Sequence, residues 1–123
     1  MIRRWSMVKM STEEQKKIYA YLGFAAKAKK AKAGEQAALA HLKKNNVYLL
    51  IISETAQAKS IERWKRRAQE YHVPYIIFGS QENLGRAIGT SYKTIIALTD
   101  QKLADAILLC NGGALWEKLE SMN

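Results

Sequence analysis

The sequence has little of the chemistry on which disulfide-stapled, secreted or membrane-spanning proteins depend. Its 123 residues include one cysteine, Cys110, so no intrachain disulfide can form, and one proline, Pro74. A single cysteine is typical of a chain from the reducing cytoplasm, and a buried thiol explains it better than a reactive one. No apolar run approaches the ~20 residues that a membrane helix needs, and the N-terminus has no apolar signal segment. We therefore expect a cytoplasmic protein with no membrane partner.

Acidic residues are scarce relative to basic ones. Lysine and arginine total 20 against 11 aspartate and glutamate residues, which gives a formal net charge of +9 at pH 7. Solubility alone rarely requires such an excess, and the imbalance is typical of proteins that bind polyanions. A chain of this length suits one domain with a real core. We divide it into a basic, flexible segment over residues 1–10 and a single domain over residues 11–123.

The motifs of metal, nucleotide and catalytic sites are also missing. Cys110, His41 and His72 are too scattered to indicate a metal site, and core or helix-end positions explain each of them. Gly85 and Gly89 do not form the G-x-G-x-x-G motif of dinucleotide-binding proteins, and there is no Walker lysine motif. We expect no catalytic residue, no metal and no cofactor.

Apolar periodicity predicts a chain in which strands and helices alternate. Capping boxes at Ser11 and Thr12 precede helical spacing, and strand-length apolar runs are followed by polar helix-capping residues. The predicted helices cover about residues 12–29, 34–44, 56–72 and 81–88, with a further one ended by residues 111–113 and a short packed one near 115–119; the predicted strands cover 47–52, 74–78 and 94–98. This order predicts an α/β fold, a three-layer α/β/α sandwich with a mixed, largely parallel central sheet.

The most informative stretch is the lysine-rich approach to Gly34 and the helix that follows it. The first backbone N–H groups of a helix lack internal partners and lie at the positive end of its dipole, so phosphate is a natural ligand there. Lys29, Lys30 and Lys32 add positive charge just upstream, and Gly34 has no Cβ to hinder the approach of a ligand. The same residues also fit an ordinary loop with solvated lysines and a glycine N-cap. Both interpretations stay open.

A second basic cluster covers residues 63–67, Arg-Trp-Lys-Arg-Arg, within the helix expected over residues 56–72. Phosphate would suit this cluster, yet a run of charge on a helix is usually only a solvated face. We treat it as a secondary patch.

Five motifs occur in the same order and register as in a known family. They are residues 22–27, 32–36, 49–54, 73–75 and 84–89. Over about residues 17–109 they resemble the kink-turn RNA-binding ribosomal-protein superfamily (archaeal seven-Ae / eukaryotic thirty-e type), above all its small bacterial members of the YlxQ type. The Gly34 helix start combined with Leu-Gly-Arg-Ala-Ile-Gly is specific, whereas either motif alone is not. The resemblance implies an α/β/α sandwich that binds structured RNA through the start of the second helix and the loop after residue 89.

The RNA-binding residues that this resemblance implies fall into two segments. They are Lys29, Lys30, Lys32, Gly34, Glu35 and Gln36 at the helix start, and Arg86, Ile88, Gly89, Thr90, Ser91, Tyr92 and Lys93 at the loop. Amides after Gly34 would hold the sugar–phosphate backbone, Gln36 would reach a base edge, and Tyr92 would stack on an unpaired base. Core packing explains Ile88 at least as well as RNA contact does.

The sequence departs from the family pattern at positions that read bases. Members that bind kink-turns tightly typically carry an Asn-Glu or Lys-Gln pair two and three residues after the glycine, and a lysine three residues further on. Here those positions hold Gln36, Ala37 and Ala40. We therefore expect RNA binding through the main chain and the basic side chains, with a reduced preference for a kinked RNA.

These observations lead to the interpretation of a monomeric, non-catalytic RNA-binding protein. It is either associated with the ribosome or bound to another structured, kink-turn-like RNA. A first alternative is an RNA-recognition module that works with an RNA-modifying enzyme, because the fold also resembles accessory domains of ribose methyltransferases. A second is a protein-interaction module with incidental basicity, whose protein partners would persist after nuclease treatment.

Overall fold

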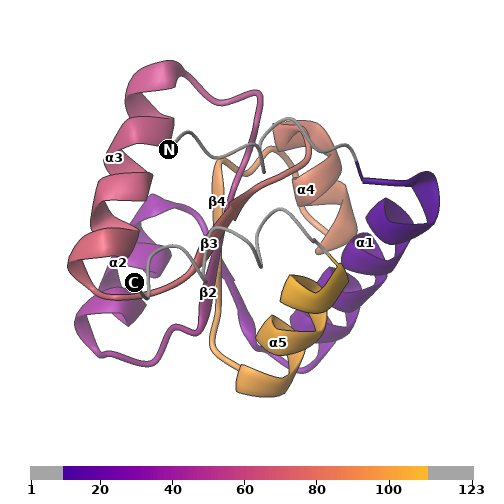
Figure 1. The fold of residues 1–123 in the computed structure, drawn as a ribbon, viewed down its shortest axis with the longest axis horizontal. Helices are drawn as coiled ribbons and strands as arrows, with labels where there is room; N and C mark the ends of the chain where they lie inside the picture. Colours follow the sequence, from indigo (N-terminus) through magenta and orange to yellow (C-terminus); the bar gives the residue numbers. More distant parts are fainter. Residues whose placement is uncertain (1–9, 111–123) are drawn as a thin grey trace, which may run out of the picture.

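The structure, a computed structural model, describes residues 10–110, which form five helices and one four-stranded sheet (Figure 1). In chain order the elements are α1 (Thr12–Lys27), β1 (Ala31–Ala33), α2 (Glu35–Lys43), β2 (Leu49–Ile52), α3 (Ala58–Glu70), β3 (Tyr75–Ile77), α4 (Gln81–Ala87), β4 (Ile95–Leu98) and α5 (Gln101–Cys110). The helix expected near residues 115–119 and nearly all of the segment over residues 1–10 lie outside the described residues. None of the helices described is long and apolar enough to cross a membrane.

The strands lie in the order β1-β4-β2-β3, and only β2 and β3 run parallel. A mixed sheet within an α/β fold is confirmed, but the expectation that it is largely parallel is wrong, because β4 runs antiparallel to both of its neighbours. The physical reason is the length of α4. Its seven residues span only about 10 Å, and the Lys93 N–H donates to the Gln81 carbonyl at 3.0 Å. The chain therefore re-enters the sheet at the end where it left β3.

β1 has no counterpart among the predicted strands. It comprises Ala31, Lys32 and Ala33, and it pairs with β4 so that Ala31 lies opposite Leu98 and Ala33 opposite Ile96. Three residues with a central lysine show no apolar pattern that predicts a strand. A short edge strand that carries a lysine is a common way to prevent further strand pairing.

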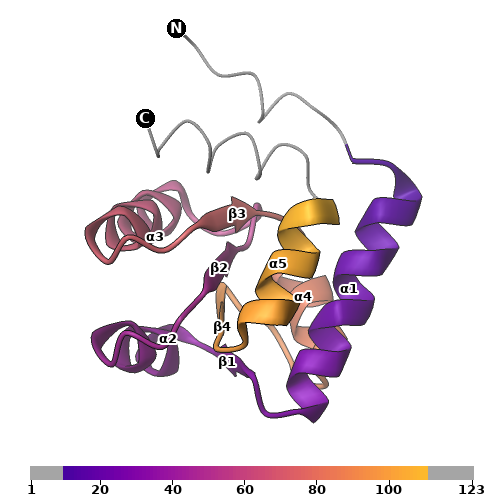
Figure 2. The same ribbon diagram turned by 60° about the horizontal axis from the view of Figure 1, so that its bottom comes forward.

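Helices cover both faces of the sheet, which makes the three layers of the predicted sandwich. Figure 2 shows α2 and α3 on one side of the strands and α1, α4 and α5 on the other. All four residues of β2 are fully buried, with Leu49 and Ile51 in the core beneath α1 and α5, and Leu50 and Ile52 in the core beneath α2 and α3. This alternation explains why the predicted strands are apolar on both faces.

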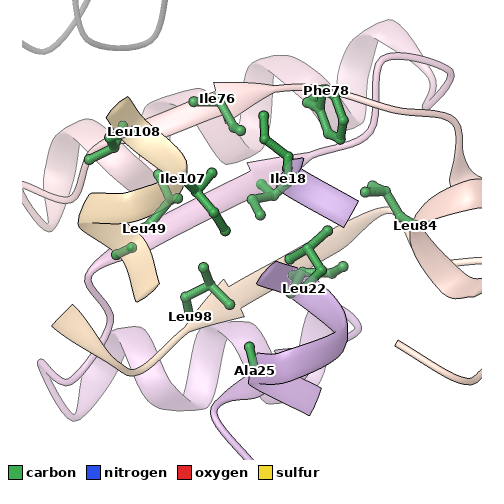
Figure 3. Packing of buried hydrophobic residues seen from close by; sticks show 13 residues of the cluster. Ile18, Leu22, Ala25, Leu49, Ile76, Phe78, Leu84, Leu98, Ile107 and Leu108 are labelled. Carbon is green, nitrogen blue, oxygen red and sulfur yellow. The ribbon is translucent and has the colours of Figure 1, made fainter. Parts of the chain in front are cut away.

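The larger core lies between the sheet and α1, α4 and α5. Figure 3 shows Ile18 and Leu22 of α1 and Ile107 of α5 directed onto the strands. Each of these side chains is fully buried, and burial of one such side chain stabilises the fold by about 1.5–3 kcal/mol. The spacing of Ile18, Leu22 and Ala25 is the helical spacing seen in the sequence.

Four helices are followed by a residue with positive φ, which is Gly89 after α4 and a residue other than glycine after α1, α2 and α3. The three residues other than glycine are Lys29 (φ 61°), Asn45 (φ 58°) and His72 (φ 58°). The helix ends predicted near residues 44 and 72 are confirmed to within two residues. The first helix ends at Lys27, earlier than predicted, because the reversal at Lys29 turns the chain into β1.

Candidate functional site

The start of α2 is built around Gly34, which adopts φ 96° and ψ 157°. Its N–H donates to the carbonyl of Ile95 at 3.0 Å, and the first bond of the helix runs from the Ala38 N–H to the Gly34 carbonyl at 3.0 Å. The backbone N–H groups of Glu35, Gln36 and Ala37 therefore have no carbonyl acceptor within the helix. A Cβ built on Gly34 would meet no atom within 4 Å. The space that a side chain at position 34 would enter is therefore open.

Other helices use a side chain to satisfy their first amides. Ser11 accepts from the Glu14 N–H at 3.1 Å, Ser80 from the Asn83 N–H at 3.0 Å, and Asp100 from the Leu103 N–H at 2.9 Å. Neither α2 nor α3 has such a bond. The start of α2 thus combines an open approach with amides that no capping side chain satisfies, which is the arrangement that binds anions.

The two segments singled out in the sequence come together at one end of the sheet. β1 finishes here beside the start of β4, because Ala33 lies opposite Ile96 and Gly34 bonds to Ile95. The loop over residues 88–93 leads directly into β4 at the same end. β2 and β3 also finish here, since Ile52 pairs with Ile95 and Ile77. We call this the Gly34 end of the sheet.

The three predicted lysines do not all lie at the Gly34 end. Lys32 belongs to β1, and its side chain points to the α2 side of the sheet, because its neighbours Ala31 and Ala33 pack on the opposite core. The Lys30 carbonyl instead accepts from the Thr99 N–H at 2.9 Å, beyond the far end of β4. Lys30 precedes Gly34 by four positions along an extended chain, which corresponds to about 13 Å. Lys29 and Lys30 are therefore distant from the open amides.

The residues of the second segment divide into exposed and packed groups. Glycine 89 (φ 79°), Thr90 and Ser91 are exposed, and the Tyr92 ring is 65% exposed. Ile88 packs against the core beneath α1, as its alternative interpretation suggested. The exposed aromatic ring is therefore that of Tyr92, next to the half-buried Lys93.

Arg86 and the first residues of α2 have exposed side chains. The Arg86 guanidinium donates to Asn83 Oδ1 at 3.1 Å and lies 3.9 Å from the Glu82 carboxylate. Exposed ion pairs of this kind contribute little free energy, so the guanidinium can exchange partners. Glu35 and Gln36 are exposed as well, and Glu35 lies 3.5 Å from Arg63 of α3.

Gly85 determines the position of the loop over residues 88–93, although it is not among the site residues predicted from the sequence. The Gly85 carbonyl accepts from the Thr90 N–H at 2.8 Å. A Cβ on Gly85 would overlap with the Ser91 carbonyl group and would lie 3.0 Å from the Tyr92 nitrogen. The loop backbone thus packs where a side chain would stand. A glycine inside a helical pattern often marks such a close approach, which is the signal that could have identified it.

We expect Gly85→Ala to displace the loop. Alanine in place of glycine normally stabilises a helix by about 0.5–1 kcal/mol, but here the backbone of Ser91 must move first. The expected result is a lower melting temperature and faster hydrogen exchange at the amides of Thr90 and Lys93. Gly23→Ala in α1 is the matched control, because its Cβ would meet only the Ala87 carbonyl, at an ordinary 3.5 Å. A stabilised Gly85→Ala variant with unchanged exchange would show that the loop tolerates the added methyl group.

A polar network ties the loop to the ends of β2 and β3. Gln81 donates from its side chain to Thr94 Oγ1 at 2.9 Å and from its backbone to Thr55 Oγ1 at 3.0 Å. The buried Ser53 hydroxyl donates to the Gly79 carbonyl at 3.1 Å and accepts from the Thr55 N–H at 3.1 Å. These bonds connect the ends of β2 and β3 to the residue that precedes β4, at the Gly34 end. The sequence marks these polar residues only as helix caps, because the partners are distant along the chain.

Tyr19 of α1 lies beside this network. Burial raises the pKa of its phenol, the hydrogen bond to Asn83 acts in the opposite direction, and the Glu54 carboxylate raises the pKa further. The phenol therefore stays neutral at physiological pH. It acts as a packing and hydrogen-bonding group that joins α1 to α4.

Nothing in residues 10–110 forms a cluster of three or more His, Cys, Asp or Glu side chains able to hold a metal ion. His41 Nδ1 instead lies 3.1 Å from Asn46 Oδ1, at the end of α2. The half-buried Cys110 has a free thiol. His41 thus lies near a helix end as expected, whereas Cys110 packs only partly against the core and is not the buried thiol that the sequence suggested.

The fold is thus a small α/β/α sandwich in which the uncapped start of α2, the loop over residues 88–93 and Lys32 of β1 lie at one end of the sheet. The chain belongs to the Ribosomal protein L7Ae/L30e/S12e/Gadd45 family, whose profile matches residues 16–108. This match confirms the family that the five sequence motifs resemble.

Relatives and solved structures agree with this assignment. The chain is 29% identical over 87 residues to the RNA-binding protein YlxQ of Bacillus subtilis (strain 168), which covers 71% of this chain and 87% of that protein. A protein of unknown function from Bacillus halodurans C is 25% identical, with a TM-score of 0.74 over 78% of this chain and 97% of its own. The Giardia lamblia 15.5kD RNA binding protein is 20% identical, with a TM-score of 0.71 over 92% and 99%, and shows the shared fold.

Proposed function

We propose that this protein is a non-catalytic RNA-binding protein of the cytoplasm that acts as a monomer, with residues 11–123 as its single RNA-binding domain. Family membership supports RNA as the partner, and so does the similarity to a protein named for RNA binding. The charge of +9 suits a polyanion. The RNA is structured, and it is either ribosomal or another kink-turn-like RNA.

The observation that carries the proposal is the pairing of an open helix start with an exposed loop at the Gly34 end. The amides of Glu35 and Gln36 can donate to phosphate oxygens, and Gly34 lets the RNA backbone come close. Tyr92 offers a stacking surface for an unpaired base, which is how proteins commonly hold RNA bulges. Lys32 and Lys93 supply positive charge on either side.

The test is a binding titration with two RNAs of equal length, one with a kink-turn and one a straight duplex. We expect the wild-type protein to bind the kinked RNA more tightly, by a modest factor, because Ala37 and Ala40 cannot read bases. Absence of binding to either RNA would contradict the proposal. Protein partners that persist after nuclease treatment, with no RNA recovered by crosslinking in cells, would favour a protein-interaction module instead.

We expect the RNA affinity to fall steeply with salt, because phosphate contacts release counterions. The log–log slope should approach roughly one per phosphate contact. Lys32→Ala should make it shallower by up to about 0.7–0.9, whereas Lys29→Ala and Lys30→Ala, which lie far from the open amides, should change it less. Lys16→Ala on the exposed face of α1 is the control and should leave the slope unchanged. Affinity that does not depend on salt would exclude a polyanion ligand.

A further inference from the structure

The exposed face of α3 carries a basic stripe that the Gly34 end does not include. The helix holds five basic and two acidic residues. Lys59, Arg63, Arg66 and Arg67 follow one another at spacings of three, four or one residues, which places them on one face. Trp64 and Ala68, both fully buried, occupy the opposite face. We call these four side chains the α3 stripe.

The α3 stripe is continuous with the Gly34 end. Arg63 Nη1 lies 3.5 Å from the carboxylate of Glu35, the first residue of α2. α2 and α3 lie in the same layer of the sandwich (Figure 2), and α3 begins just after β2 finishes, at the Gly34 end of the sheet. Lys59 stands one helical turn, about 6 Å, nearer to that end than Arg63. A ligand bound at Gly34 would therefore contact the α3 stripe if the ligand extended over the α2 and α3 layer.

Much of the positive charge in the stripe is not neutralised. Lys59 and Arg66 are exposed, and neither has an ion pair within the part of the chain that the structure describes. Arg67 lies over the Trp64 ring, with its guanidinium carbon 4.6 Å from the ring centroid. This stacking holds the cation in place without cancelling its charge. Glu62 and Glu70 lie at the same helical spacings from these cations, so the face carries both signs, but its four cations exceed its two carboxylates.

We propose that the α3 stripe binds the phosphate backbone of a helical stem that flanks the RNA motif held at the Gly34 end. This inference rests on the proposed RNA-binding function and extends it to a second part of the same RNA. The stripe covers about 12 Å from Lys59 to Arg67, and an A-form stem presents its phosphates to such a surface while its deep, narrow major groove keeps the base edges out of reach. The contact is therefore electrostatic and independent of the stem's sequence.

The experiment compares three RNAs that share one kink-turn motif. The first has minimal stems, and the other two have one stem or the other lengthened by about a helical turn. Each is titrated with the wild-type protein and with Lys59→Gln/Arg66→Gln, which removes two exposed cations and leaves the Trp64 stacking and the Glu35 ion pair intact. The control Lys16→Gln/Lys17→Gln removes the same charge from exposed positions on α1, in the other helical layer.

The stripe variant should lose about tenfold in affinity for one of the two lengthened RNAs. It should also lower that RNA's log–log salt slope by about 1.4–1.8, because two phosphate contacts are removed. Binding of the minimal RNA should match the wild type, and the control should match it on all three RNAs. An equal loss with the control variant, or an equal loss on the minimal RNA, would overturn the inference.

The two proposals can fail separately. If the wild-type protein binds none of the three RNAs, the proposed function is wrong, and the inference falls with it. If the protein binds them and the stripe variant behaves as the wild type, only the α3 inference is wrong. The stripe would then be a solvated face or a contact for an acidic protein.

Discussion

Gly34→Val should reduce RNA affinity by about a hundredfold or more while the domain still folds. The added side chain would extend into the open space beside the start of α2, where we propose that the RNA backbone approaches. Each hydrogen bond to a charged group is worth about 1.5–3 kcal/mol, so the loss of two gives at least this factor. Valine at φ 96° also strains the backbone by about 1–3 kcal/mol, less than the stability of a typical domain.

The control for this strain is Asn45→Val, at the other end of α2. Asn45 also has a positive φ, 58°, but it follows the last turn of the helix rather than the first. Both variants should lower the melting temperature, and only Gly34→Val should lose RNA binding. RNA-binding titrations of the wild type and both variants at one salt concentration, with circular dichroism to confirm folding, distinguish the loss of binding from the strain. Unchanged affinity in a folded Gly34→Val variant would move the binding site elsewhere.

Ala37→Glu combined with Ala40→Lys should raise the preference for a kinked over a straight RNA by about tenfold or more. A bidentate contact to a base edge is worth about 1–3 kcal/mol in DNA complexes, and a similar contact to RNA would produce this ratio. The structure can accept both changes. Ala37 is half-buried and Ala40 is exposed, while Ala38 and Leu42 form the packed face of α2. A glutamate in the first turn also suits the helix dipole.

The single variants separate base reading from charge. Ala40→Lys alone adds a cation and should strengthen binding to both RNAs equally. Ala37→Glu alone should weaken binding to the straight duplex through charge repulsion and raise the ratio of the two affinities. A double variant with the same gain on both RNAs would mean that this face of α2 does not contact bases.

Much of the fold was predictable because burial leaves a periodic trace in the sequence. Ile18, Leu22 and Ala25 repeat at helical spacing, and the apolar runs that become β2, β3 and β4 have the length of strands. The capping box at Ser11 and the stop at Asn45 are local patterns, so they could be identified without a tertiary structure. The observed ends of these helices and strands differ from the predicted ends by no more than about two residues, because helix and strand ends fray.

The direction of β4 and the existence of β1 could not be predicted in this way. Both depend on pairing between segments that are distant along the chain. β1 at Ala31–Ala33 forms only against β4 at Ile95–Leu98, more than 60 residues away, and the antiparallel partner of β4 in the centre of the sheet, β2, is more than 40 residues away. The alternating order of elements suggested parallel crossovers, but it does not specify where a short helix returns the chain. Because α4 has only seven residues, the chain returns to the end of the sheet where it left β3, and β4 runs antiparallel.

The sequence by itself determined the family, the three layers and the two segments proposed to bind RNA, because each depends on local residue types and spacing. Only the tertiary structure decided which lysines lie beside Gly34, because an extended strand carries Lys30 about 13 Å away while Lys32 stays adjacent. It also decided that the Gly34 helix start and the loop over residues 88–93 share one end of the sheet, and that Arg63 lies against Glu35. These neighbours are far apart along the chain, and the sheet register and helix packing that join them leave no local pattern in the sequence.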